Sequence, residues 1–303
     1  MVEDTKTSTQ QENGSFVITT NFPFTIFNQL QQPFKDVLRK LKRKDFHSNL
    51  KTSEEWGKIF LWTIKESKTD EIDTLKKLNY LWQNMPGRFA LSCLNYTFTE
   101  EYVGFKKETT IITSWKQKEN ALLKSIKNHS IPLIEWCLEH GANPNVEDEH
   151  GNTAFMRLLQ EFSRPQTDKI KEEKGYNYAP KLPMKLFIKT LRANADIFAR
   201  NQNGDTTIMA ACFNIPVIKK LILYGVNVAA RNKNGENVLD KMKSSYVITE
   251  SALGGSNGVH HTKLEQEVES FLTQKLGLSP QLPCYLSKHP LYKVIKLKEK
   301  QNG

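Results

Sequence analysis

The most constraining feature of this 303-residue sequence is a turn pattern that occurs three times in one register. In each copy, a first turn residue is followed by a short polar stretch, a second turn residue and then a helical pattern. Both series of turn residues are separated by 53 and then 31 positions. Such internal repeats fold as similar units, each of which covers its neighbour. The first turn residues are Gly141, Asn194 and Gly225, and the second are Gly151, Gly204 and Gly235.

The residue types at these positions fit particular backbone conformations. Glycine or asparagine directly after a helical run is typical of a left-handed C-cap. The dipeptides at 203–204 and 234–235 are Asn-Gly, which favours a tight turn with positive φ. Thr153, Thr206 and Asn237 follow the second turn, so we expect each of them to cap the N-terminus of the next helix.

A second helix is expected before each first turn residue. Its apolar side chains fall at i, i+3 and i+4, which is typical of a helix that packs one face on its neighbours. Residues 119–141 fit a complete helix–turn–helix. The three stripes are Ile134, Cys137 and Leu138; Phe187, Thr190 and Leu191; and Ile218, Leu221 and Ile222.

This frame resembles the ankyrin repeat, a unit of about 33 residues with a β-turn, two helices and the motif T-P-L-H-x-A. The matching hexads are 153–158, 206–211 and 237–242. The middle hexad, TTIMAA, matches best, whereas Leu158 and Met242 stand where the family has alanine. The spacing of 53 implies an insertion of about 20 residues, and the spacing of 31 a deletion of about two.

The resemblance implies an all-α fold, an ankyrin-repeat helical solenoid with a helical N-terminal region, and it covers a little over half of the chain. The expected division is a disordered lead-in at 1–20, the helical region at 21–116, about four ankyrin-like repeats at 117–278 with insertions at 163–183 and 251–261, and a basic tail at 279–303.

The N-terminal region carries no family resemblance. Thr52 and Glu55 form a capping box that opens one amphipathic helix, and Asp70 opens a second. A third is expected to begin at Pro33, since proline is favoured in the first turn of a helix. The stretch 86–116 fits either helix or strand, and decayed repeats are an alternative for the region as a whole.

Composition indicates a globular chain with 38% hydrophobic and 25% charged residues. Residues 1–15 have no apolar stretch, so we expect no secretory signal, and no apolar run is long enough for a membrane span. Zinc sites and disulfide frameworks need clustered cysteines. The four cysteines are not clustered, which favours a reducing, cytoplasmic location; they are Cys93, Cys137, Cys212 and Cys284.

The net charge of +10 is concentrated at 35–44 and 286–300. A basic surface favours acidic partners or nucleic acid. We interpret these runs as solvated helix faces and a charged tail, so nucleic acid is not the partner that we expect. The helix at 35–44 also has the face separation of a membrane-surface or partner helix, but we favour a bundle helix that buries this apolar face.

Candidate chemical sites are weak. The run 147–150 holds three acids and a histidine on an expected exposed loop, where nothing shifts a pKa towards catalysis. His261 and Glu265 have the spacing of metal ligands on one helix face, but a third ligand is not evident beside them and His260. The glycine-rich stretch 254–258 lacks the Lys-Ser/Thr of a phosphate loop. We therefore expect a protein without enzymatic activity, cofactor or metal.

Ankyrin stacks bind other proteins through their turn tips and the concave face of their first helices, so the resemblance implies a monomeric protein-interaction module. The first tip is acidic and the third basic, which suggests a partner with a matching charge gradient; reversing Asp148 and Arg231 together would test this surface. The expected partner-binding residues are Glu147, Asp148, Glu149, His150, Arg157, Arg200, Asn201, Gln202, Met209, Phe213, Arg231, Asn232 and Lys233.

The alternative is an effector-like chain, of the kind that intracellular bacteria deliver into host cells. In that case residues 1–116 hold an unrecognised activity and the repeats serve as a targeting arm. A weaker third option is a ubiquitin-ligase adaptor, although no box motif supports it.

Overall fold

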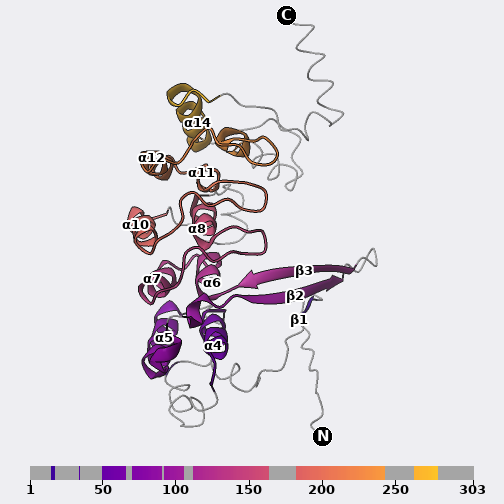
Figure 1. Cartoon of the computed structure of the whole chain (residues 1–303), viewed down its shortest axis with the longest axis vertical. Helices are drawn as coiled ribbons and strands as arrows, with labels where there is room; N and C mark the ends of the chain where they lie inside the picture. Colours follow the sequence, from indigo (N-terminus) through magenta and orange to yellow (C-terminus); the bar gives the residue numbers. More distant parts are fainter. Residues whose placement is uncertain are drawn as a thin grey trace, which may run out of the picture. The chain divides into compact units, whose positions relative to one another are not determined.

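The computed structural model describes residues 15–17, 34, 50–65, 70–90, 92–105, 112–163, 182–242 and 263–278. These residues are mostly helical (Figure 1). They belong to two compact units. Unit 1 consists of Met1–Glu149 and Ile188–Ala195, and unit 2 of His150–Phe187 and Asp196–Gly303. Helix α10 (Met184–Arg192) is divided between them.

Unit 1 contains two helix pairs. Helix α4 packs against α5 and α6, and helix α7 packs against α5 and α6. Each helix of the second pair therefore lies on one helix of the first, which buries the apolar stripes on both. The bounds are α4 Ser53–Lys65, α5 Glu71–Asn84, α6 Ala121–Lys127 and α7 Ile131–Glu139.

The predicted helix starts in unit 1 are confirmed. The Thr52 amide donates to Glu55 Oε2 over 2.9 Å, and the Glu55 amide donates to Thr52 Oγ1 over 3.2 Å, which completes the capping box. The Asp70 carboxylate accepts two amide hydrogen bonds at the start of α5. Of the helix predicted from Pro33, only Phe34 is described, and it is helical.

A three-stranded antiparallel sheet contradicts the prediction of a wholly helical N-terminal region. Strand β1 (Ser15–Val17) pairs with β2 (Phe98–Phe105), which pairs with β3 (Ile112–Glu119). Strand β1 lies within the stretch that we expected as a disordered lead-in, and β2 and most of β3 take the strand alternative that the sequence left open at 86–116. Aromatic and β-branched residues, which favour strands, are frequent in β2, and this explains why it forms a paired strand and not a helix.

An aromatic cluster fills the core of unit 1. The ring centroids of Phe60, Trp82 and Trp136 lie 5.7–5.9 Å from one another. His140 stacks on Trp136 at 4.2 Å and closes the cluster at the end of α7. Large aromatic rings contribute the most buried area per residue, so this cluster accounts for much of the packing between the two helix pairs.

Unit 2 contains α8 (Ala154–Ser163), α11 (Thr207–Ala210), α12 (Ile215–Leu223) and α14 (Lys263–Ser270). Helix α14 continues into a π-helical turn, Phe271–Lys275, and residues 238–242 are also helical. Helix α8 packs on α11. The buried side chains of this unit include Phe155, Leu159, Phe187, Ile208, Val217, Ile218, Leu221, Val238, Leu239, Val268 and Leu272.

Some predictions fall where the structure gives no description. Residues 164–181, most of one predicted insertion, lie outside the described residues, as do the insertion at 251–261 and the tail at 279–303. The three described cysteines, Cys93, Cys137 and Cys212, are buried. Among the described residues, no helix combines the length and the apolar character needed to cross a membrane.

Candidate interaction surface on the turn loops

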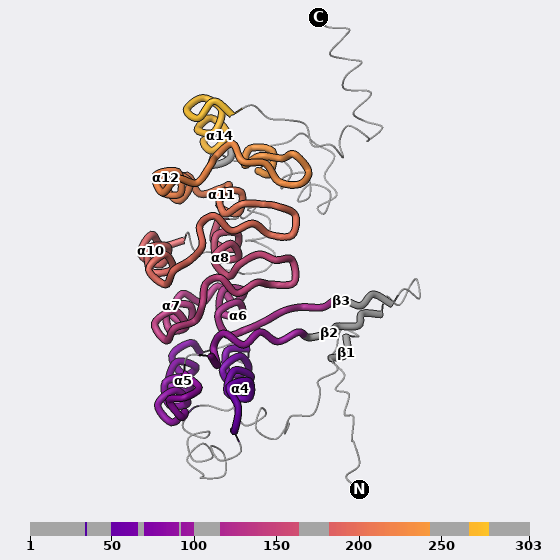
Figure 2. The backbone as a smooth tube through the Cα atoms, in the orientation of Figure 1, coloured from indigo at the N-terminus to yellow at the C-terminus, as the bar shows by residue number. Residues whose placement is uncertain are grey.

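Three turn loops of equal length connect the helices, and the predicted turn residues in and beside them have the positive φ angles that we expected. We define the first turn loop as residues 142–152, the second as 195–205 and the third as 226–236; the second and third, both in unit 2, are seen in Figure 2. Every predicted turn residue has positive φ, as its type requires. The angles are 85° at Gly141, 63° at Asn194, 87° at Gly225, 73° at Gly151, 76° at Gly204 and 79° at Gly235.

Two of the three predicted N-caps form as expected. Thr153 Oγ1 accepts from the Met156 amide over 3.1 Å, and Asn237 Oδ1 accepts from the Leu239 and Asp240 amides. Thr206 differs: its amide donates to the sulfur of Met209 over 3.4 Å, while its hydroxyl has no partner among the described residues. Methionine at this helix position cannot complete a capping box as strongly as a carboxylate does.

The second and third turn loops each contain a buried asparagine whose side chain accepts hydrogen bonds from amides of the same loop. Asn201 Oδ1 accepts from the amides of Asn203 and Asp205, at 3.0 and 2.9 Å. Asn232 Oδ1 repeats this pattern with the amides of Asn234 and Glu236, at 3.0 and 2.9 Å. Each loop therefore satisfies its buried backbone donors with its own side chain.

Adjacent loops in unit 2 are joined by a recurring backbone hydrogen bond. The Gln202 amide donates to the His150 carbonyl over 3.1 Å, and the Lys233 amide donates to the Asn203 carbonyl over 2.9 Å. The two bonds occupy equivalent positions of successive repeats. We call this series of loop-to-loop bonds the loop ladder.

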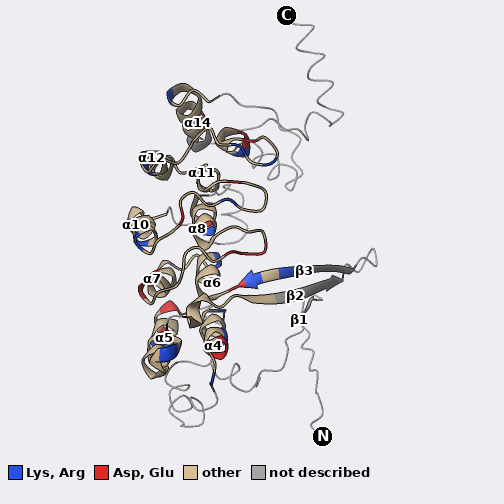
Figure 3. Ribbon diagram, viewed as in Figure 1, with Lys and Arg blue, Asp and Glu red and all other residues tan. Residues whose placement is uncertain are grey.

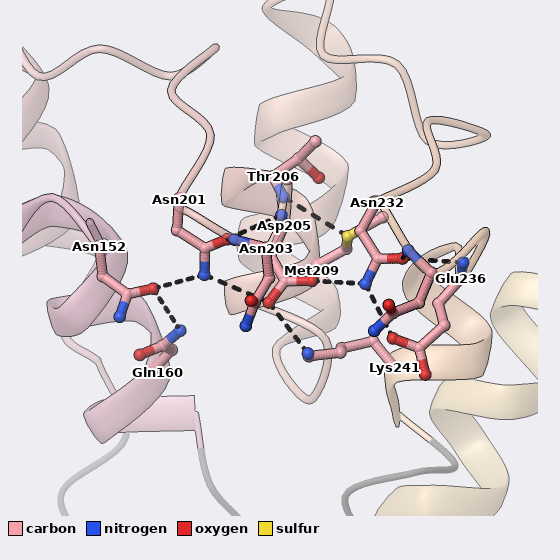
Figure 4. A network of polar contacts seen from close by, with 12 residues as sticks. Asn152, Gln160, Asn201, Asn203, Asp205, Thr206, Met209, Asn232, Glu236 and Lys241 are labelled. Atoms are coloured by element: carbon pink, nitrogen blue, oxygen red, sulfur yellow. Dashed lines mark hydrogen bonds and ion pairs between the residues drawn. The ribbon is translucent and has the colours of Figure 1, made fainter. Parts of the chain in front are cut away.

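Side chains form a second series of links between the same loops (Figure 4). Asn201 Nδ2 donates to Asn152 Oδ1 at 2.9 Å, and Asn232 Nδ2 donates to Asp205 Oδ1 at 2.7 Å. Lys241 Nζ lies 2.9 Å from Asp205 Oδ2. The buried carboxylate of Asp205 thus has both amide donors and a cation, as a buried charge requires.

The first turn loop is anchored within unit 1. Glu149 Oε2 accepts from the Lys118 amide of β3 over 2.9 Å, and Asn95 Oδ1 accepts from the Asn143 amide over 2.7 Å. Asn145 Nδ2 donates to the Asn194 carbonyl. Asp148 is only 4% exposed. One carboxylate oxygen of Glu149 is therefore hydrogen-bonded to β3, and the Asp148 side chain is buried.

Five of the residues predicted to contact a partner are buried. The sequence places them at loop tips or on open helix faces, but each is exposed by less than a tenth, which leaves little area for docking. The five are Asp148, Asn201, Met209, Phe213 and Asn232.

The remaining predicted residues keep accessible side chains. Charges of both signs occur in the described loops and helices (Figure 3). Arg157 is half-buried and pairs with Glu161 at 3.1 Å. Of the residues predicted to bind a partner, the exposed ones in the turn loops are Glu147 and His150 in the first, Arg200 and Gln202 in the second, and Arg231 and Lys233 in the third.

The two loop arginines are held in place by their own turns. Arg200 Nη1 donates to the carbonyls of Gly204 and Arg231, and Arg231 Nη1 donates to the carbonyl of Gly235. A guanidinium group has five N–H donors in a rigid fork, so each arginine can still bind an external acceptor. Both are pre-positioned, which lowers the entropy lost on binding.

A row of buried polar residues directly before the helix N-caps was not predicted. Glu119, Asn152, Asp205 and Glu236 occupy this position in successive copies and are each at most 5% exposed. A signal is present in the sequence, because every copy has a carboxylate or amide there. Their role in linking loops is apparent only from the contacts between copies.

Glu119 in unit 1 is surrounded by cations. Its carboxylate lies 3.0 Å from Lys65 Nζ and 3.6 Å from the Nζ atoms of Lys124 and Lys127. Burial alone would raise the pKa of Glu119, but attraction to Lys65 and the other two lysines lowers it below 4.5. Burial, reinforced by repulsion from Lys127 and Lys65, lowers the pKa of Lys124 despite the attraction of Glu119.

The remaining candidates for chemistry gain no support. Among the described residues, no group of three or more His, Cys, Asp or Glu side chains could hold a metal ion. His260 and His261 lie outside the described residues, and so does the glycine-rich stretch 254–258. Burial raises the pKa of the Cys137 thiol to about 12, which makes it a poor nucleophile.

Comparison with known proteins returned no relatives: no protein-family model matches the chain, and a search of curated proteins finds no significant match.

Proposed function

We propose that this chain is an ankyrin-type repeat protein without enzymatic activity, and that it binds another protein through the exposed side chains of its turn loops. The observation that carries this proposal is the loop ladder, in which equivalent amides, Gln202 and Lys233, donate to the preceding loop. The positive φ angles at six register positions support the same assignment.

The loop ladder suits binding because it fixes the exposed residues in advance. Gln202 and Lys233 directly follow the buried Asn201 and Asn232, and their amides donate to carbonyls of the preceding loop. A surface whose side chains are held by a rigid backbone loses little conformational entropy when a partner docks. Repeat proteins use extended surfaces of this type.

The charges of the exposed residues indicate what the partner presents. Glu147 gives the first turn loop an acidic side chain, and Arg231 and Lys233 give the third loop a basic character, whereas exposed Arg200 and Asp196 balance each other in the second. We propose a protein partner with acidic groups for the third loop and a basic group for the first. Such complementarity raises the association rate and selects the partner.

Charge reversal at Asp148 and Arg231 would not test this surface cleanly, because Asp148 is buried and Arg231 braces its own turn. Glu147→Lys combined with Lys233→Glu reverses two exposed charges and leaves the net charge unchanged. A partner is first captured by cross-linking to the wild-type chain and then purified. Its Kd is measured against wild type and the double variant, and we expect at least about a tenfold loss of affinity.

The matched control reverses two exposed charges away from the turn loops, through Lys76→Glu in α5 and Glu267→Lys in α14. This control should bind as wild type does. Equal weakening by both double variants would indicate a general charge effect, and no weakening by Glu147→Lys with Lys233→Glu would exclude the turn loops as the binding surface.

A further inference from the structure

Two Asn-Gly dipeptides lie at the same place in successive turn loops, at 203–204 in the second and 234–235 in the third. The φ angles of the two glycines are nearly equal, 76° and 79°. Each glycine amide donates to the carbonyl of the buried asparagine of its own loop, Asn201 or Asn232, over 2.8 Å and 3.0 Å. The two dipeptides therefore have the same sequence and the same turn geometry.

Asparagine followed by glycine can react with its own backbone. The glycine nitrogen attacks Cγ of the asparagine, so that a new N–Cγ bond forms and the Cγ–Nδ2 bond breaks. The side-chain nitrogen leaves as ammonia, with the proton that the glycine amide loses. Water then opens the succinimide ring at either carbonyl and gives aspartate or isoaspartate. Glycine favours the reaction because it has no Cβ and moves freely, but the turn must open before the glycine nitrogen can reach Cγ.

The second turn loop is covered by the third. The Lys233 amide donates to the Asn203 carbonyl over 2.9 Å, and Arg200 Nη1 donates to the carbonyls of both Gly204 and Arg231. Gly204 is buried, and a Cβ atom built on it would lie 3.1 Å from the Lys233 nitrogen. Opening of the turn at Asn203 must therefore displace the backbone of Lys233 and break one bond of the loop ladder.

The third turn loop lacks these contacts among the described residues. Asn234 and Gly235 are both exposed, and no described atom lies within 4 Å of a Cβ built on Gly235. The Asn234 carbonyl accepts no hydrogen bond from any described residue. Among these residues, the peptide group between Asn234 and Gly235 is held only by the amide bond to the Asn232 carbonyl. Local opening of an exposed turn with so few bonds costs little free energy.

We propose that Asn234 is a site of spontaneous deamidation, whereas the third turn loop protects the equivalent Asn203 from the same reaction. The reaction replaces a neutral amide with a carboxylate directly after Lys233, an exposed cation of the third loop. A consequence that rests on the proposed function is a gradual loss of affinity for an acidic partner. The other Asn-Gly dipeptides, at 13–14, 257–258 and 302–303, lie outside the described residues.

Peptide mapping by mass spectrometry measures both sites in one sample of the full chain, incubated at neutral pH and physiological temperature. Synthetic peptides of 199–207 and 230–238 give the rate of each sequence without the fold. We expect Asn234 to react within about tenfold of the rate of its peptide, and Asn203 at least about tenfold more slowly than Asn234 after the same correction. Equal protection of the two asparagines would overturn the proposal, and so would an unmodified Asn234 when its peptide is fully converted.

Asn234→Gln is the matched control, because its amide carbon lies one methylene further from the glycine nitrogen and closes a ring much more slowly. Incubated wild type and incubated Asn234→Gln share every other modification, so a difference in Kd for the captured partner reports the reaction at Asn234 alone. We expect the wild type to lose at least about threefold in affinity relative to the variant. A modified Asn234 with unchanged Kd would support the modification site and contradict the binding role of the third loop.

Discussion

Asn201 and Asn232 make the same hydrogen bonds 31 residues apart. Each Oδ1 accepts two amides of its own loop, and each Nδ2 donates to the residue before the preceding helix cap, Asn152 or Asp205. One side chain therefore shapes a loop and joins it to its neighbour. The conformation of each loop and its link to the preceding loop are therefore both stabilised by the same buried side-chain amide.

Asn201→Ala should destabilise unit 2 by about 1–3 kcal/mol, because the buried amide of Asp205 and the part-buried amide of Asn203 lose their acceptor, and Asn152 Oδ1 keeps only its donor Gln160. Urea unfolding followed by circular dichroism measures the change. Gln202→Ala, at the exposed neighbouring position, is the control and should change stability by less than about 0.5 kcal/mol. Equal effects of the two substitutions would show that the buried amide has no special role.

Alanine at two turn glycines separates backbone strain from packing. Gly204 and Gly235 have nearly the same φ, 76° and 79°, so alanine costs about 1–2 kcal/mol of left-handed strain at either position. Only at Gly204 would the new Cβ also press on the backbone of Lys233, at 3.1 Å. We expect Gly204→Ala to lower the thermal midpoint more than Gly235→Ala. The reverse order would contradict the described contact between the loops.

Glu119→Gln should destabilise unit 1 by about 1–3 kcal/mol at neutral pH, because Lys65, Lys124 and Lys127 lose their shared counter-charge. The pKa of Glu119 is lowered below 4.5 in the folded state, so its contribution is complete above that pH and is lost as pH falls through the folded pKa. The stability difference between wild type and variant should therefore shrink as pH falls through the lowered folded pKa of Glu119. A constant difference would show that the Glu119 charge contributes nothing.

The sequence predicts the local features of this fold well. Positive φ at Gly141, Asn194 or Gly225 depends on residue type and on the helix just before it, both of which are visible in a single sequence. The capping box of Thr52 and Glu55 is local for the same reason. Features set by neighbours within four residues along the chain can therefore be predicted from the residues alone.

Features that depend on contacts between copies cannot be predicted in this way. Asn201 and Asn232 have the composition of exposed tips, but they are buried where their side chains bond to the preceding loop. The sequence does not distinguish strand from helix at β2 and β3, because short apolar stretches fit both periods. The pairing of these strands joins residues up to 21 positions apart, such as Phe98 and Glu119.

Amide exchange of Gln202 and Lys233, measured residue by residue with NMR, tests the loop ladder most directly. Both amides lie at exposed residues and donate to the His150 and Asn203 carbonyls, so we expect these bonds to slow their exchange. We predict that both are protected in the wild type and that Asn201→Ala removes the protection at Gln202. Exchange of both amides at the rate of an unstructured peptide would contradict the ladder and the binding surface built on it.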